Sequence, residues 1–209
     1  MLIPFDVVLT FLAASFVLAL VPGPDNIFVL TQSALYGRVS GLMVVFGLCT
    51  GLIVHTCAVA LGVAVIFQTS AVAFSILKFF GAAYLLYLAY GAFRAGASDI
   101  KAKNDGAKKY SKLYLRGIVM NVTNHKVSIF FLAFLPQFAD PMRGSVPLQI
   151  VGFGALFMIS TVFVFGAVAL LAGSLGKVLK KSSNIQIYLN KFAALVFLGL
   201  ACKLALLKN

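Results

Sequence analysis

Charged residues are scarce in this chain of 209 residues: they make up 11% of it, and only five are acidic. A soluble domain carries about 25% charged residues, so this scarcity excludes an ordinary soluble fold. The sequence also lacks a CxxC pair, a zinc-binding pattern and a GxxxxGK[ST] phosphate loop. We therefore expect no thiol redox centre, no metal, no cofactor and no direct ATP hydrolysis. The three cysteines, Cys49, Cys57 and Cys202, lie inside apolar runs and are expected to be packing residues.

Apolar residues dominate instead, at 62% of the chain, and they form continuous runs. A helix needs about 20 apolar residues to cross a hydrocarbon layer of about 30 Å. The runs predict an all-α, polytopic membrane protein with six transmembrane helices and no separate soluble domain. Their approximate bounds are 5–21 (extending past Asn26 if the helix continues), 42–67, 71–93, 117–138, 147–175 and 188–207. The runs do not alternate apolar and polar residues, as the strands of a membrane barrel do.

The net charge of +12 is concentrated between these runs, where it indicates orientation rather than a nucleic-acid partner. The basic residues of the odd-numbered connections are Arg38; Arg94, Lys101, Lys103, Lys108, Lys109, Lys112 and Arg116; and Lys177, Lys180, Lys181 and Lys191. Basic connections face the cytoplasm, which predicts a bacterial inner-membrane protein with both termini in the periplasm. The start of the chain lacks the basic region of a signal peptide, so the first run is expected to remain as a span.

The long basic connection at 94–116 divides the single transmembrane domain into a half at about 1–93 and a half at about 117–209. Each half has three predicted spans. An odd number of spans gives the halves opposite orientations, so we expect a 3+3 inverted-topology repeat. The first span of each half carries the unusual polar or helix-breaking residues, which is where binding sites at broken helices occur.

The first of these segments is a predicted helix break at Pro22, Gly23 and Pro24. Proline removes a backbone donor, so the helix must kink or end there. Asp25 and Asn26 follow directly, where a carboxylate within apolar sequence could bind a substrate ammonium group or a proton. The alternative is a simple turn at the water interface in which Asp25 caps the next helix.

The second segment contains Asn121, Asn124 and Lys126. Lys126 lies about nine residues, or roughly 13 Å, into the fourth run, so its ammonium group needs polar partners. If the span starts later, Lys126 is merely interfacial. His55, nearly midway along the second run, is either a satisfied structural donor or a site or proton-relay residue.

Several segments together resemble one known family. They are Val-Pro-Gly-Pro-Asp-Asn at 21–26, Tyr-Gly-Arg-Val-Ser-Gly at 36–41, the Gly-xxx-Gly-xxx-His series at 47–55, Gly-Ala-Ala-Tyr-Leu-Leu-Tyr at 81–87 and Phe-Leu-Pro-Gln-Phe at 134–138. The chain resembles the lysine exporter (LysE) superfamily over essentially its whole length, and within it the RhtB branch of homoserine and threonine efflux proteins. The resemblance implies a six-span inner-membrane exporter of amino acids or their derivatives, in exchange for protons.

The resemblance also implies site residues. Pro22, Gly23, Pro24 and Asp25 match the first family signature, and Asn124 and Lys126 match an Asn-Pro-Lys signature. His125 stands where that proline is usual, and we expect its absence to soften the second helix break.

The predicted function is therefore secondary export of amino acids, with the site between the first and fourth spans. The partners are a small amino-acid substrate, protons and the lipid bilayer, and assembly into a homo-oligomer is compatible with such a chain. An alternative is a divalent metal-ion exporter of the same superfamily, although two histidines and no glutamate make a poor ligand supply. An intramembrane redox or protease enzyme is the other alternative, and the sequence lacks its motifs.

Overall fold

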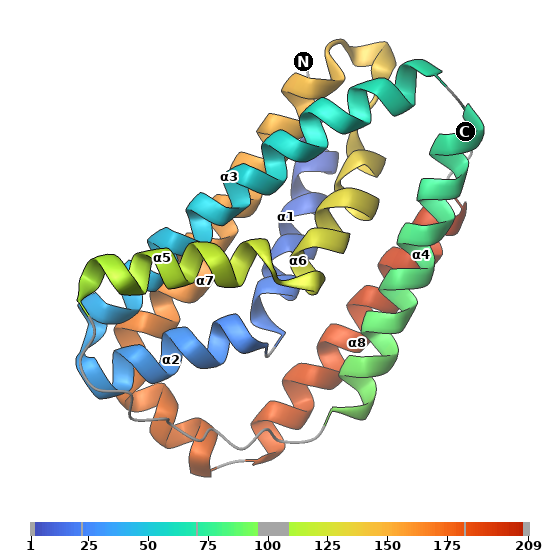
Figure 1. Cartoon of the computed structure of the whole chain (residues 1–209). Helices are drawn as coiled ribbons and strands as arrows, with labels where there is room; N and C mark the ends of the chain where they lie inside the picture. The colour runs from blue at the N-terminus through green and yellow to red at the C-terminus, as the bar shows by residue number, and fades with distance from the viewer. Residues whose placement is uncertain (1–2, 22, 70, 96–108, 182, 207–209) are drawn as a thin grey trace.

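A computed structural model describes residues 3–21, 23–69, 71–95, 109–181 and 183–206 (Figure 1). Within these ranges the chain is helical and contains no strand, as predicted. The α-helices are α1 (Phe5–Leu20), α2 (Pro24–Tyr36), α3 (Arg38–Thr69), α4 (Ala71–Arg94), α5 (Tyr110–Val122), α6 (His125–Ile129), α7 (Val146–Lys181) and α8 (Ser183–Leu206). A π-helical turn at Phe130–Phe134 and short 3₁₀ turns at Leu135–Phe138 and Pro141–Arg143 continue α6 toward α7.

Two helices contain apolar stretches long enough to cross a membrane on their own: Arg38–Gly62 in α3 and Val146–Ala172 in α7. Two helix pairs have the required length and composition only when taken together. They are α1 with α2, bent by 62°, and α5 with the α6 segment, bent by 50°. If each bent pair is one span, the described residues contain up to four spans, so the number six stays a prediction.

Helix bounds differ from the predicted runs mainly at polar ends. α3 begins at Arg38 rather than at residue 42, and α5 begins at Tyr110 rather than at residue 117. Polar and basic residues continue a helix beyond its apolar stretch because the helical hydrogen bonds do not depend on hydropathy. The apolar runs in the sequence therefore locate the apolar part of each helix and leave out its polar ends.

The long helices pack in two pairs, α3 with α7 and α4 with α8. The two short helices α2 and α5 lie against the first of these pairs: α2 packs against α3 and α7, and α5 packs against α3 (Figure 1). The α2–α3 junction, the end of α4, the start of α5 and the α7–α8 junction lie toward one end of the molecule. The start of α1, the α3–α4 junction and the start of α7 lie toward the other (Figure 1). The first end therefore carries the helix ends that flank the basic connections, and we call it the basic end.

α3 and α5 approach so closely that glycines are required at their crossing. A Cβ on Gly117 would lie 2.5 Å from Val44 O, and a Cβ on Gly47 would collide with Tyr114 O. The glycine spacing noted in the sequence thus serves backbone packing, as small residues do between membrane helices.

The interior is filled by aromatic rings, and the outer surface is apolar as well. Phe11, Phe130, Phe131, Phe153 and Phe197 are fully buried in one cluster around the π-helical turn. Large side chains such as Leu61, Phe80, Phe163 and Leu195 are exposed on the outside. An apolar exterior over helices with satisfied backbones is the surface that hydrocarbon requires.

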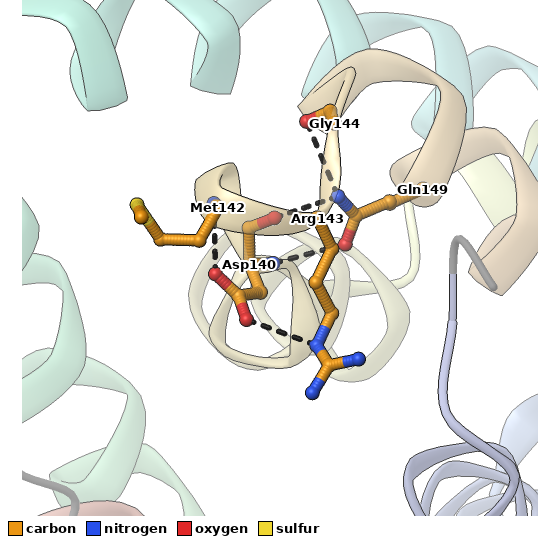
Figure 2. A network of polar contacts seen from close by, with 5 residues as sticks. All are labelled: Asp140, Met142, Arg143, Gly144 and Gln149. Carbon is orange, nitrogen blue, oxygen red and sulfur yellow. Dashed lines mark hydrogen bonds and ion pairs between the residues drawn. The ribbon is translucent and has the colours of Figure 1, made fainter.

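The turn before α7 is held by a polar network (Figure 2). Asp140 accepts a hydrogen bond from Met142 N and pairs with Arg143 Nε at 3.1 Å. The buried Gln149 accepts from Asp140 N at 2.9 Å and donates to Asp140 O at 2.8 Å. The charges of this connection therefore compensate each other, in contrast to the basic end.

Candidate functional site

The break between α1 and α2 leaves backbone carbonyls without their usual helical donors. In a continuous helix, Leu18 O and Leu20 O would accept from the N–H groups of residues 22 and 24, which are prolines. Pro22 lies outside the described residues; Gly23 is extended and precedes Pro24, which starts α2. Carbonyls orphaned at membrane depth need other partners from protein or water.

Side chains from both halves donate to three carbonyls at this end of α1. Lys126 Nζ donates to Leu18 O at 3.1 Å and to Val21 O at 3.2 Å. Asn26 Nδ2 donates to Ala19 O at 2.8 Å. The lysine ammonium group thus sits at the carboxyl end of α1, where the helix dipole favours a cation.

Gly23 gives the ammonium group its space. A Cβ at this position would lie 3.3 Å from Lys126 Nζ, closer than side chains normally approach. The φ of Gly23 is −157°, which any residue can adopt. Glycine is therefore needed here because a side chain would displace the Lys126 ammonium group, and not because the backbone conformation requires glycine.

The second break lies between α5 and α6, at Thr123 and Asn124. Asn124 is extended, and its side chain accepts a hydrogen bond from Lys126 N at 3.0 Å, which caps α6. The carbonyl of Asn121 accepts from Asn124 N at 3.0 Å and contacts His55 Nε2 at 3.2 Å. The break thus forms with His125 in the usual place of proline, because the asparagine cap supplies the local hydrogen bond.

The two breaks meet in a buried hydrogen bond. Asn124 Nδ2 donates to Asp25 Oδ2 at 2.7 Å, and the two residues are 99 positions apart in the chain. Both side chains are buried, and Asp25 lies in the first turn of α2, where the helix dipole favours a carboxylate. The Lys126 ammonium group interacts electrostatically with the Asp25 carboxylate, while its hydrogen bonds go to the α1 carbonyls.

Two cavities adjoin this site, and Lys126 lines both of them. The inner cavity has a volume of about 20 Å³, and its polar lining is Asp25, Asn121, Lys126 and Thr161. The outer cavity has a volume of about 240 Å³. Its lining is Val21, Tyr87, Leu88, Gly91, Ala92, Ala95, Lys126 and Asn190, from the α1 end, α4, α6 and α8.

The structure therefore brings four of the predicted residues together: Asp25, Asn121, Asn124 and Lys126. Asn26 is turned toward the α1 carbonyls. His55 lies at the edge, against Asn121 O and the Phe131 ring, and is not among the residues lining either cavity.

Two lining residues were not singled out from the sequence, Thr161 and Asn190. Each is a polar side chain within a long apolar helix, and this contrast is the sequence signal that could have found them. Within the described ranges, no three His, Cys, Asp or Glu residues converge in a way that could hold a metal ion.

Two broken helices that meet at a buried charged site between long apolar helices are typical of membrane transporters. Residues 16–208 match the family described as LysE type translocator, and the chain belongs to this family. It is accordingly a multi-pass membrane protein of a transport family.

Three relatives illustrate the family. A Vibrio cholerae protein, described as an uncharacterized membrane protein, is 31% identical over 96% of this chain and 97% of its own length. The Bacillus subtilis membrane protein YrhP is 26% identical over 95% of this chain and 98% of its own length. A Salmonella typhi protein described as a homoserine/homoserine lactone efflux protein is 31% identical over 90% of this chain and 91% of its own length. No solved structure matches the chain.

Proposed function

We propose that this protein is a proton-coupled secondary exporter of small amino acids or their derivatives in the bacterial inner membrane. The observation that carries the proposal is the meeting of the buried Asp25 and Asn124 with the half-buried Lys126 at two helix breaks, beside a cavity. A buried carboxylate and a half-buried ammonium group together complement an amino-acid zwitterion.

The substrate enters through the outer cavity in this proposal. That cavity is lined by Ala95, which follows the end of α4, and by Asn190 near the start of α8. Both lie toward the basic end, which we take as cytoplasmic by the positive-inside rule. The conformation is then one that loads substrate from the cytoplasm, as an exporter requires.

Lys126 is the group that the arriving carboxylate meets. Its present acceptors are the Leu18 and Val21 carbonyls, which are neutral. A substrate carboxylate offers a stronger, charge-assisted hydrogen bond and can replace one of these carbonyls. Asp25 then receives the substrate ammonium group, and a proton from the periplasmic side replaces this group on the carboxylate after release. Competition between a proton and an ammonium group for one carboxylate gives exchange without a nucleotide.

The substrate class follows from the site and from one relative. Homoserine and its lactone, named for the Salmonella typhi relative, both have a primary amino group, and only homoserine has a free carboxylate. A site that holds the ammonium group firmly and the carboxylate through a single lysine suits both kinds of compound. We therefore propose homoserine-like and threonine-like substrates.

The helix order supports the proposed inverted repeat. Each half has a broken pair followed by two long helices, α1–α2 before α3 and α4, and α5–α6 before α7 and α8. Long helices at equivalent places pack with each other, α3 with α7 and α4 with α8. The proposed six spans are the two broken pairs together with α3, α4, α7 and α8, and the start of α1 and the end of α8 lie toward the end opposite the basic one (Figure 1).

Export is tested in cells that overproduce the chain. Cells loaded with radiolabelled homoserine, threonine, lysine or homoserine lactone are washed, and the rate of release is measured with and without a protonophore. We expect faster release of homoserine or threonine than from vector cells, and loss of the difference on adding the protonophore. Release equal to that of vector cells for every compound would contradict the proposal.

A further inference from the structure

We propose that Thr161 is a specificity-determining residue that, with Asp25 and Asn121, forms a three-oxygen site for the primary ammonium group of the substrate. The inference rests on the proposed function and deepens it. It assigns the inner cavity, which the Lys126 side chain adjoins, to the amino end of the substrate.

Three residues that line the inner cavity each carry a buried side-chain oxygen without a hydrogen-bond partner. The oxygens are Asp25 Oδ1, Asn121 Oδ1 and Thr161 Oγ1, on α2, α5 and α7. The three side chains are 5%, 3% and 2% exposed, so bulk solvent does not satisfy them. A buried polar atom without a partner is costly and is uncommon in a native fold. Three such oxygens on residues around one small cavity indicate a ligand there.

Thr161 is one of three buried helical hydroxyl groups without a hydrogen-bond partner in the described residues; the other two, Thr31 and Ser33, lie in α2 and do not line the inner cavity. Serine and threonine in helices normally donate to the carbonyl four residues back. Thr56 does so to Leu52 O at 2.8 Å, and the adjacent Ser160 does so to Leu156 O at 3.1 Å. The Thr161 hydroxyl does not donate to the carbonyl four residues back, although the hydroxyl of Ser160 on the same helix does.

The chemistry of the three oxygens selects the ligand. A carboxylate and an amide oxygen only accept hydrogen bonds, and a hydroxyl can accept one as well. A primary ammonium group has three N–H donors, one for each oxygen. A cavity of about 20 Å³ has room for about one water-sized group, so a methyl or acyl group on the nitrogen is excluded.

Charge favours an amino acid over a bare metal cation. Asp25 and Lys126 together are neutral when both are ionised, and a zwitterion adds no net charge. A sodium ion would add an uncompensated positive charge beside the half-buried Lys126, which is expensive in low dielectric. The amino-acid substrate brings a carboxylate for Lys126 along with its ammonium group.

The test compares three variants of the purified protein in detergent. Thr161→Val removes only the hydroxyl, Thr161→Ser retains it, and Ser160→Ala removes the neighbouring hydroxyl that serves its own helix. Binding is measured as the rise in melting temperature on titrating L-homoserine, L-threonine, L-lysine or L-leucine, with N-acetyl-L-threonine and sodium chloride against choline chloride as controls. Efflux from cells is measured in parallel.

We expect at least one free amino acid to stabilise the wild type, and N-acetyl-L-threonine and sodium to have no effect. Thr161→Val should weaken the apparent affinity about tenfold, because one hydrogen bond to a charged group is lost. Its melting temperature without ligand should equal or exceed that of the wild type, since an unpaired buried hydroxyl is gone. Thr161→Ser should bind like the wild type, and Ser160→Ala should bind normally with a lower melting temperature.

Wild-type affinity in Thr161→Val would overturn the site while leaving export intact. Stabilisation by sodium that Thr161→Val abolishes would overturn the ammonium assignment in favour of a metal cation. Equal binding of N-acetyl-L-threonine would overturn the requirement for a primary amine. A wild type that neither binds nor exports any of the amino acids would refute the proposed function, and the site with it.

Discussion

Removal of the Lys126 ammonium group should destabilise the protein more than neutralisation of Asp25. Lys126 holds two carbonyls at the end of α1 in addition to its attraction to Asp25. Lys126→Met keeps most of the side-chain volume and removes all of these interactions. Asp25→Asn leaves the ammonium group on its two carbonyls, so its charge is not stranded.

The magnitude follows from the groups left without partners. Each orphaned carbonyl costs about 1 kcal/mol, and the loss of the cation beside Asp25 adds a further contribution of about 1–2 kcal/mol. Lys126→Met should therefore lower the free energy of unfolding by about 3–4 kcal/mol, and Asp25→Asn by about 1 kcal/mol or less. For a chain of this size the larger loss corresponds to a melting temperature lower by roughly 5–15 °C.

The assay is thermal unfolding of the purified variants in one detergent, with Lys191→Met as the matched control. Lys191 is exposed at the basic end of α8, so its substitution should change the stability by less than about 0.5 kcal/mol. The double variant Asp25→Asn with Lys126→Met should recover the part of the loss that comes from the unpaired Asp25 charge, about 1–2 kcal/mol, but not the part that comes from the orphaned carbonyls. A greater loss in Asp25→Asn than in Lys126→Met would refute the assignment of Lys126 to the broken end of α1.

Three further predictions follow from the same geometry. In a cysteine-free background, Met142→Cys should react with an impermeant reagent in intact cells and Lys109→Cys should not; the reverse pattern would invert the topology. Gly117→Ala should reduce the yield of folded protein, with a cost of about 1–3 kcal/mol by overpacking of α3 against α5, and a normal melting temperature would contradict the close crossing. Gly23→Ala should slow efflux severalfold while melting within a few degrees of wild type, because it displaces the Lys126 ammonium group by a few tenths of an ångström; unchanged efflux would show that this position of the lysine is dispensable.

The helices and the two unusual segments could be predicted from the sequence because the relevant signals are local. Long apolar runs indicate membrane helices, and Pro22 and Pro24 indicate a helix break whatever surrounds them. Asp25 and Lys126 stood out because ionisable residues in apolar sequence are rare and expensive. None of these signals depends on which helices are in contact.

The contacts within the site could not be predicted in the same way. The Asp25 carboxylate accepts its hydrogen bond from Asn124, which is 99 positions away, and no local signal in the sequence indicates this contact. Lys126 satisfies carbonyls that only the geometry of the α1 end leaves open. Thr161 was missed because the hydroxyl of a helical threonine ordinarily donates to the carbonyl four residues back. The sequence does not show that the Thr161 hydroxyl lacks this hydrogen bond.

Transport in proteoliposomes tests the central claim most directly, because it isolates the chain from every other carrier of the cell. Purified wild type and Asp25→Asn are reconstituted at equal density into vesicles preloaded with radiolabelled homoserine, and release is followed after an inward proton gradient is imposed. The account predicts rapid, gradient-dependent release from wild-type vesicles and release from Asp25→Asn vesicles no faster than from protein-free vesicles. Equal gradient-dependent release from both proteins would contradict the role of Asp25 as the shared site of proton and substrate.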